Sequence, residues 1–146
     1  MSITIREVTA ENFIDAIRLQ PTPEQQRFVA SNAASIAQSK FDTFLECYGI
    51  YNGDTMVGFS AFGKNPDDGE AWIARHMVGA EHQRQGHGRA GLLAIIEHMR
   101  RTYECSAIFL DVGPTNTAAI ALYEQAGFVD TGKTQGEGKV YRLDLG

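Results

Sequence analysis

Several features that mark common protein classes are scarce in this sequence. Its 146 residues include two cysteines, Cys47 and Cys105, which lie far apart and form neither a C-x-x-C pair nor a zinc pattern. This favours reduced, buried thiols over a disulfide framework. No apolar run is long enough to cross a membrane, and the N-terminus lacks the basic and apolar blocks of a signal peptide. We therefore expect one cytoplasmic domain, residues 1–146, with no membrane partner.

Positive charge is scarce as well. Lysine and arginine number 13 against 18 aspartates and glutamates, which gives a formal net charge of −5. Binding to nucleic-acid phosphates usually requires an excess of basic residues on one face, so the composition argues against DNA or RNA as a partner. The same composition is compatible with a cationic substrate.

The histidines give no metal-binding pattern. Of His76, His82, His87 and His98, only His82 and His87 are near each other, and both belong to a stretch that we assign below to anion binding. We therefore expect no metal.

What the sequence does contain is a regular alternation of strand and helix patterns, without repeats or a long linker. Alternating or continuous apolar runs predict strands at residues 3–9, 47–52, 56–63, 70–79, 107–112, 128–132 and 140–145. Apolar residues at three- and four-residue spacing predict helices at residues 10–19, 28–41, 88–101 and 116–126. The order βααβββαβαββ predicts an α/β (α+β) protein with a mixed central sheet and flanking helices.

Some elements carry more specific expectations. The first helix has an apolar stripe formed by Phe13, Ile14, Ile17 and Leu19. The three strands between residues 47 and 79 are expected to form an antiparallel meander. The nearly all-apolar strand 107–112 suits burial on both faces of the sheet.

One glycine-rich stretch raises a question of function. GHGRAG, Gly86 to Gly91, can be read as the G-x-G-x-x-G turn of a dinucleotide-binding fold, with Asp111 as the ribose ligand. Such a turn follows the first strand directly, whereas AEHQRQ intervenes here, and the remaining chain is too short for the further strand–helix units. A Walker loop is excluded because no lysine followed by serine or threonine closes the glycines.

The chemistry of this stretch still favours an anion site. Gly86 and Gly88 permit close approach of a bulky anion, and the following helix presents unpaired N–H groups. Arg84 and Arg89 add positive charge. Together these features predict a pyrophosphate cradle. The alternative is a flexible glycine turn that only starts the helix.

Two motifs resemble the GCN5-related N-acetyltransferases, the GNAT family. QRQGHG, Gln83 to Gly88, matches the family's Q/R-x-x-G-x-G/A motif, and NTAAIALYEQAGF, Asn116 to Phe128, resembles its N-x-x-A-x-x-L-Y-x-x-x-G-F segment. The order of elements from Ile3 to Leu145 agrees as well. The resemblance implies the GNAT fold and an N-acetyltransferase that uses acetyl-CoA.

The resemblance also implies which residues hold acetyl-CoA. The pyrophosphate would be bound at Gln83, Arg84, Gln85, Gly86, His87, Gly88 and Arg89. Backbone N–H groups near Met77, Val78 and Gly79 would pair with pantetheine on a bulged or splayed strand, and Gly79 suits a bulge. An oxyanion contact from this strand is implied too, without a particular donor.

The spacing of Asn116 and Tyr123 fits a long, thin ligand such as the pantetheine of acetyl-CoA lying along a helix, with the amide of Asn116 at one end as a cofactor-binding group. The distance between them is about 10.5 Å, nearly two turns, so both side chains share one face with Ala119 between them. In the family the matching tyrosine donates a proton to the departing thiolate, which makes Tyr123 the general acid by resemblance. The alternative is a core tyrosine with a satisfied hydroxyl.

The implied reaction transfers acetyl directly to a primary amine, without a covalent acyl-enzyme. The amine must first lose a proton. Some family members use a glutamate on the third meander strand for this step, but the position that aligns with it here is Ala74. His76, Glu70, Asp111 and an ordered water stay open as the general base.

The expected acceptor is a polyamine. Residues 21–41, together with WIARHMV and HQRQGHG, resemble bacterial spermine/spermidine acetyltransferases. Polyamines need carboxylates along the cleft; the candidates by sequence are Glu24, Glu46, Asp67, Asp68 and Glu70, although a solvated face is the ordinary account of such charges. Two alternatives remain: a CoA-binding sensor module without catalysis, and transfer to a protein N-terminus or lysine.

A homodimer is expected by analogy with the family. The final strand VYRLDL, residues 140–145, is expected to offer an edge for pairing between subunits.

Overall fold

The computed structural model describes residues 2–26 and 30–146. It contains one seven-stranded mixed sheet with the strand order β1-β2-β3-β4-β5-β7-β6. The strands are β1 (Ile3–Glu7), β2 (Glu46–Asn52), β3 (Thr55–Lys64), β4 (Ala71–Val78), β5 (Ala107–Val112), β6 (Val129–Gln135) and β7 (Gly138–Asp144). The helices are α1 (Phe13–Arg18), α2 (Asn32–Phe41), the short 3₁₀ helix η1 (Ala80–His82), α3 (His87–Thr102) and α4 (Thr117–Gln125). The predicted fold class and element order are confirmed.

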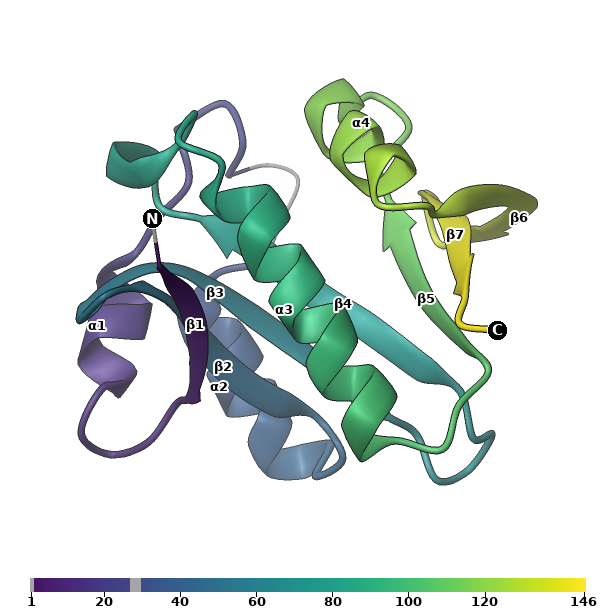
Figure 1. The fold of residues 1–146 in the computed structure, drawn as a ribbon, viewed down its shortest axis with the longest axis horizontal. Helices are drawn as coiled ribbons and strands as arrows, with labels where there is room; N and C mark the ends of the chain where they lie inside the picture. Colours follow the sequence, from purple (N-terminus) through teal and green to yellow (C-terminus); the bar gives the residue numbers. More distant parts are fainter. Residues whose placement is uncertain (1, 27–29) are drawn as a thin grey trace.

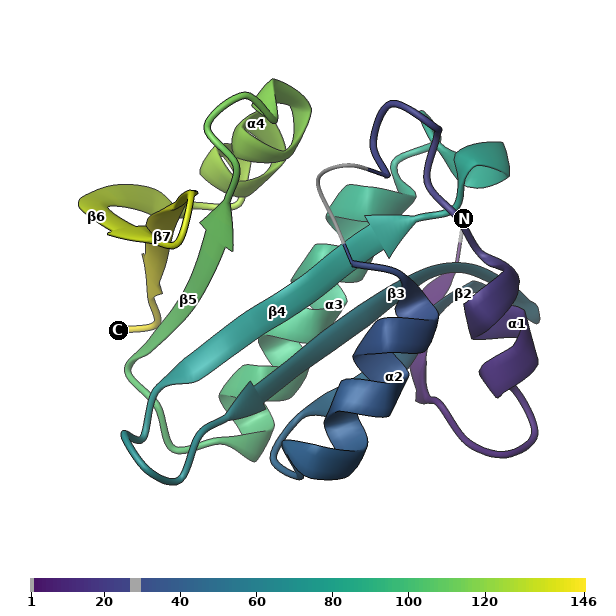
Figure 2. The same ribbon diagram turned by 180° about the vertical axis from the view of Figure 1, so that it is seen from behind.

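Helices cover the two faces of the sheet unequally. α3 crosses the face that is turned toward the viewer in Figure 1, which we name the back face. α1 and α2 lie on the opposite face, turned toward the viewer in Figure 2, which we name the front face. α4 stands beyond the end of β5. In the described part of the chain, no helix covers β5 and β7 on the front face (Figure 2).

Two hydrophobic clusters follow from this layering. The front cluster is closed by α1 and α2 and contains Ala16, Leu45, Tyr51, Met56, Phe59, Ala61 and Met77. The back cluster continues from α3 to α4 and β7 and includes Phe62, Ile73, Leu92, Ile95, Met99, Ile108, Leu110, Tyr123, Phe128 and Tyr141. α3 suits this position because Leu92, Ile95 and Met99 recur at helical spacing, whereas Leu93 is 46% exposed. The back core therefore reaches from β3 and β4 to β5 and β7.

The final strand is not an edge. β7 pairs with β5, from Val112 with Lys139 to Ala107 with Asp144, and its other side pairs with β6. The prediction of a free edge at residues 140–145 is therefore wrong, because the second strand of the last hairpin inserts beside β5. The edges of the sheet are β1 and β6.

β5 is buried on one face only, which corrects the expectation of burial on both. Ile108 and Leu110 point into the back cluster, whereas Phe109 is half-buried and Asp111 is exposed. The reason is the absence of a described helix in front of this strand (Figure 2). Phe109 and Asp111 are therefore accessible from the front face.

The two N-terminal helices are shorter than predicted. α1 packs through the buried Ala16, and Phe13, Ile14 and Ile17 are exposed. α2 begins after Ser31, whose side chain accepts a hydrogen bond from the backbone N–H of Ala34. The predicted helical residues Phe28 and Val29 lie outside the described residues.

Candidate active site

β4 and β5 enclose a V-shaped opening in the sheet (Figure 2). The two parallel strands pair only through Ala71 with Ile108 and Trp72 with Phe109. Beyond Trp72, β4 pairs with β3 alone and β5 pairs with β7 alone. The inner edge of β4 thus keeps backbone N–H and C=O groups without a strand partner, as the predicted splay requires.

The bulge of β4 lies at Ala74 rather than at Gly79. The register with β3 shifts there, because Ala61 pairs with Arg75 and Phe62 pairs with Ile73. Gly79 instead ends the strand, and its N–H donates to the carbonyl of Val57 over 2.9 Å. The prediction of a bulge at Gly79 is therefore wrong.

α3 begins with left-handed backbone turns and without a side-chain cap. Gly86, the N-cap residue, has a φ of 83°. Arg84 has a φ of 63° and is the one described non-glycine residue with positive φ, a conformation that costs about 1–3 kcal/mol. The N–H groups of the first helical turn are consequently available to an external acceptor.

The residues of the predicted pyrophosphate cradle differ in how far they are exposed to solvent. Those exposed around the helix N-terminus are Arg84, Gln85, Gly86 and Arg89. His87, in contrast, is buried, with 3% of its surface exposed. Gly88 lines the groove between α3 and α4.

Gln83 uses its side chain within the protein. Its amide nitrogen donates to the carbonyl of Val78 over 3.0 Å and to Oε1 of Gln25 over 2.7 Å. Gln25 in turn donates to Oε1 of Gln83 over 3.3 Å. Any contact of Gln83 with an anion therefore falls to its backbone.

Two adjoining pockets follow the opening between β4 and β5. The first has a volume of about 170 Å³ and is lined by Pro21, Gln25, His76, Met77, Val78, Gln83, Gly88, Asn116, Ala118, Ala119 and Leu122. The second has a volume of about 290 Å³ and is lined by Ala30, Ile73, Ala74, Arg75, His76, Leu110, Asp111, Val112, Gly113, Asn116, Ala119 and Tyr123. Because they share His76, Asn116 and Ala119, we treat them as one V cleft.

One face of α4 forms a wall of the V cleft. Asn116, Ala119 and Tyr123 all line the second pocket, which confirms that they share a face. Asn116 is also the N-cap of α4, and its side-chain oxygen accepts a hydrogen bond from the N–H of Ala119 over 3.4 Å.

Tyr123 combines burial with an uncommitted hydroxyl. Its side chain is 8% exposed, and its ring makes an edge contact with Phe128 at a centroid distance of 5.9 Å. Burial raises the pKa of Tyr123 to about 12, and the charge of Asp111 contributes in the same direction. Within residues 2–26 and 30–146, no hydrogen bond contributes to this shift. This favours the catalytic interpretation over a core tyrosine with a satisfied hydroxyl.

Comparison with known proteins agrees with this geometry. Residues 10–128 match the model of the acetyltransferase (GNAT) family. The chain belongs to this family. A curated relative, spermine/spermidine N(1)-acetyltransferase of Bacillus subtilis (strain 168), is 28% identical in an alignment of 145 positions that covers 95% of each chain.

Solved structures extend the comparison. A PaiA N-acetyltransferase from Thermoplasma acidophilum in complex with coenzyme A has a TM-score of 0.77 and 18% identity, over 99% of this chain and 100% of that one. The ribosomal-protein-S18-alanine N-acetyltransferase from Escherichia coli has a TM-score of 0.73 and 25% identity, over 99% and 94%. The chain is therefore a GNAT N-acetyltransferase with acetyl-CoA as co-substrate.

The candidate bases of this GNAT enzyme differ in their access to the V cleft. Glu70 does not line it, and its carboxylate accepts a hydrogen bond from the indole of Trp72 over 3.2 Å. Asp111 lines the same pocket as Tyr123 and is exposed. A Cβ atom on Gly138 would lie 2.7 Å from Oδ2 of Asp111, so this glycine leaves room for the carboxylate.

His76 lines both pockets of the V cleft, with one ring nitrogen hydrogen-bonded and the other buried. Nε2 lies 2.9 Å from the carbonyl of Gly88 and donates to it. Nδ1 is buried without a partner among the described residues. Burial lowers the pKa of His76, partly offset by the bond to Gly88, so the ring is held neutral.

The carboxylates suggested for polyamine binding do not line the V cleft. Glu46 accepts a hydrogen bond from the hydroxyl of Tyr103 at the far end of α3. Asp67 and Asp68 lie in the turn before β4. Glu24 is exposed in the turn after α1. Asp111 is the one acidic residue among the described lining residues.

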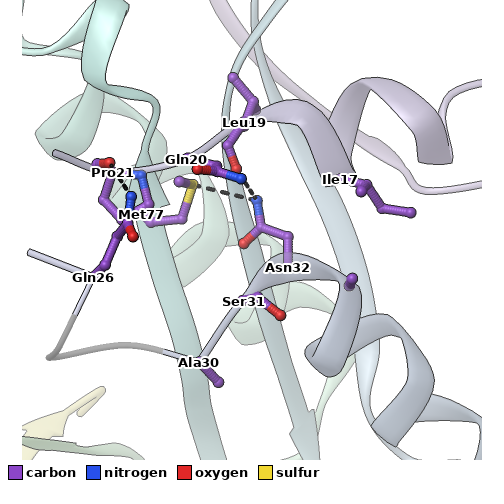
Figure 3. A pocket seen from close by; sticks show the side chains of 10 residues that line it. Ile17, Leu19, Gln20, Pro21, Gln26, Ala30, Ser31, Asn32 and Met77 are labelled. Carbon is purple, nitrogen blue, oxygen red and sulfur yellow. Dashed lines mark hydrogen bonds between the residues drawn. The ribbon is translucent and has the colours of Figure 1, made fainter. Parts of the chain in front are cut away.

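A pocket of about 280 Å³ on the front face was not indicated by any motif (Figure 3). Its wall is organised by Asn32, whose amide nitrogen donates to the carbonyl of Ala16 over 2.9 Å and to that of Leu19 over 3.3 Å. The same nitrogen lies 3.6 Å from the sulfur of Met77. The resemblance of residues 21–41 to polyamine acetyltransferases pointed to this segment, but not to the role of Asn32 or Gln25.

No helix in residues 2–26 and 30–146 is long and apolar enough to span a bilayer. In the same ranges, histidine, cysteine, aspartate and glutamate side chains form no group of three or more suited to a metal ion.

Proposed function

We propose that this enzyme transfers acetyl directly from acetyl-CoA to a primary amine of a polyamine such as spermidine or spermine. The observation that carries the acceptor is the similarity to the Bacillus subtilis spermine/spermidine N(1)-acetyltransferase, which extends over 95% of both chains. Direct transfer is supported by the V cleft, whose described lining has no cysteine, serine or lysine to form an acyl-enzyme.

In this proposal the co-substrate binds along two backbone surfaces. The N–H groups at the start of α3, flanked by Arg84 and Arg89, hold the pyrophosphate. The inner edge of β4 at Met77 and Val78 pairs with the pantetheine amides. Ala119 leaves space for this narrow chain beside α4, which supports the predicted set of contacts.

Asp111 is the proposed general base. It takes a proton from the acceptor ammonium, directly or through water, and the neutral nitrogen then attacks the thioester carbon. Glu70 lies outside the V cleft, and His76 has one ring nitrogen bonded to Gly88 and the other buried, so Asp111 is the better placed of the three candidates.

Tyr123 is the proposed general acid. When the carbon–sulfur bond breaks, the Tyr123 hydroxyl donates its proton to the departing thiolate. The acetylated nitrogen gives up its second proton to solvent, and the Tyr123 phenolate takes one proton back from solvent. A pKa of about 12 keeps the phenol protonated at neutral pH, so the proton is present when the sulfur leaves. Asp111 releases its proton to solvent to complete the cycle.

A second candidate acceptor is the N-terminal amine of a protein. The described lining of the V cleft offers one carboxylate, Asp111, and also the guanidinium of Arg75. This balance suits an acceptor with one ammonium better than one with three or four. The similarity to the Escherichia coli S18-alanine N-acetyltransferase supports the same alternative. A CoA-binding module without catalysis is disfavoured because Asp111 and Tyr123 line one pocket.

The test is release of CoA thiol from acetyl-CoA with spermidine, spermine, putrescine, an aminoglycoside, a lysine peptide and a peptide with a free N-terminal alanine. Each amine is compared with a reaction without amine, and the product is identified by mass spectrometry. Acetylation of the polyamines alone supports the proposal. Acetylation of the alanine peptide alone replaces it with the second candidate, and CoA binding without any transfer favours the sensor module.

Two further predictions accompany this function. A cytoplasmic location stays a prediction. A homodimer stays a prediction from the family, and the contact between subunits has to differ from the proposed pairing through β7.

A further inference from the structure

The segment between α1 and α2 is bonded directly to the loop that precedes α3. Gln25 and Gln83 exchange two amide hydrogen bonds, of 3.3 Å and 2.7 Å. Gln83 also donates to the carbonyl of Val78 at the end of β4. A third link joins the same regions, since the N–H of Ala80 donates to the carbonyl of Gln20 over 2.8 Å.

This segment, residues 20–26, contributes to two pockets at once. Pro21 and Gln25 line the first pocket of the V cleft, next to Gln83 and Val78. Gln20, Pro21 and Gln26 line the front pocket beside Met77 (Figure 3). A displacement of the segment therefore changes the walls of both pockets together.

We propose that Gln25 is a positioning residue that couples occupation of the co-substrate loop to the shape of the front pocket. This pocket adjoins the V cleft at Pro21 and Met77, and in the proposal it receives the part of the acceptor that extends beyond the reacting amine at Asp111. The inference rests on the proposed binding of acetyl-CoA at the start of α3. A pyrophosphate that fixes the backbone around Gln83 also fixes its side chain, and the amide pair then holds residues 20–26 in place.

The coupling has a definite physical size. A hydrogen bond between neutral groups changes an equilibrium constant by about two- to tenfold, so loss of the two bonds of the amide pair is expected to change one by at least about fivefold. Because coupling between two binding sites is reciprocal, the acceptor raises the affinity for the co-substrate by the same factor.

Hydrogen exchange with CoA alone tests the coupling without an acceptor. In the wild-type protein, CoA is expected to slow amide exchange in residues 83–89 and also, by about five- to tenfold, in residues 22–26. In Gln25→Ala, protection of residues 83–89 persists and protection of residues 22–26 is lost. Absence of CoA protection at residues 83–89 in the wild type contradicts the proposed co-substrate site. Protection there without protection at residues 22–26 overturns the coupling alone.

A second measurement follows the acceptor. With spermidine, or with the amine that gives turnover if spermidine does not, Gln25→Ala is expected to raise the acceptor KM about five- to tenfold and to change kcat less than twofold. Gln25→Glu keeps an acceptor for the Gln83 amide and is expected to recover most of the loss. Equal KM values in all three proteins overturn the coupling.

Gln38→Ala is the matched control. It removes one glutamine hydrogen bond, to Asp42 over 2.9 Å on the exposed side of α2, and leaves the amide pair intact. It is expected to behave as the wild type in both measurements. The same loss in Gln38→Ala and Gln25→Ala means a general loss of stability and overturns the coupling.

Discussion

The back and front faces of the sheet differ most where β4 meets β5. On the back face, one hydrophobic cluster runs from Ile73 of β4 through α3 to Leu110 of β5 and Tyr141 of β7. On the front face, the cluster ends at Met77, and no described helix covers β5 (Figure 2). The continuous back core holds together two groups of strands whose backbones separate. The enzyme thereby keeps a V-shaped opening in its sheet without dividing into two domains.

The back core is tested at Leu92, which is fully buried on α3. Leu92→Ala is expected to lower the free energy of unfolding by about 3–5 kcal/mol, because a cavity remains under both groups of strands. Urea denaturation followed by circular dichroism measures the loss, with calorimetry as a second probe. A single transition is expected, and two separate transitions would contradict a shared core.

Leu93→Ala is the control for this prediction. Leu93 is the next residue of α3 and points to solvent. Its removal is expected to change the free energy of unfolding by less than about 0.5 kcal/mol.

The V cleft is tested first by Tyr123→Phe. Loss of the proton donor is expected to lower kcat about a hundredfold, while the Kd for CoA stays within about twofold. Steady-state kinetics and calorimetric titration give the two values. Tyr141→Phe changes a buried tyrosine of the same back cluster that does not line the V cleft, and it is expected to leave kcat unchanged. Wild-type turnover in Tyr123→Phe would falsify the general-acid role.

Asp111→Asn tests the base at the same opening. We expect kcat/KM at pH 7 to fall about ten- to a hundredfold. His76→Asn is expected to change kcat/KM much less, because Nε2 is bonded to the carbonyl of Gly88 and Nδ1 is buried. An unchanged kcat/KM in Asp111→Asn together with a large fall in His76→Asn would move the base to His76.

Sequence patterns predicted the features that depend on neighbours along the chain. The helical spacing of Leu92, Ile95 and Met99 indicated the buried face of α3, and the spacing of Asn116 and Tyr123 placed both on one face of α4. These predictions succeeded because a helix fixes the direction of its side chains through local geometry.

Features that depend on distant pairing were missed. The insertion of β7 beside β5 and the bulge at Ala74 depend on which strands meet, and no local pattern records this. The amide pair of Gln25 and Gln83 depends on contact between remote segments for the same reason. Carboxylates such as Glu46 were wrongly expected to line the cleft, because the sequence shows that a residue is charged but does not show where it lies in the fold.

The smallest expected effect concerns His76, whose hydrogen bond to the carbonyl of Gly88 links β4 to α3. His76 is held neutral with a pKa below its ordinary value of 6.5, so the unfolded chain binds a proton more readily than the folded one. With respect to His76, the folded protein has its full free energy of unfolding above about pH 6.5. This free energy falls as the pH drops toward the lower pKa that His76 has in the folded state. Thermal unfolding from pH 7.5 to 5 is expected to show this slope in the wild type. His76→Asn is expected to flatten it, and an equal slope in both proteins would assign it to other groups.

Trp72 occupies the point where the paired part of β4 and β5 ends. It is the one tryptophan of the sequence, it stacks on Phe109 at a centroid distance of 5.4 Å, and its indole donates to Glu70. Any change in the angle between the two strands alters this stacking and the solvation of the indole. The enzyme thus carries an intrinsic fluorophore at the apex of its active-site opening. Its emission offers a label-free signal for ligands that widen or close the sheet.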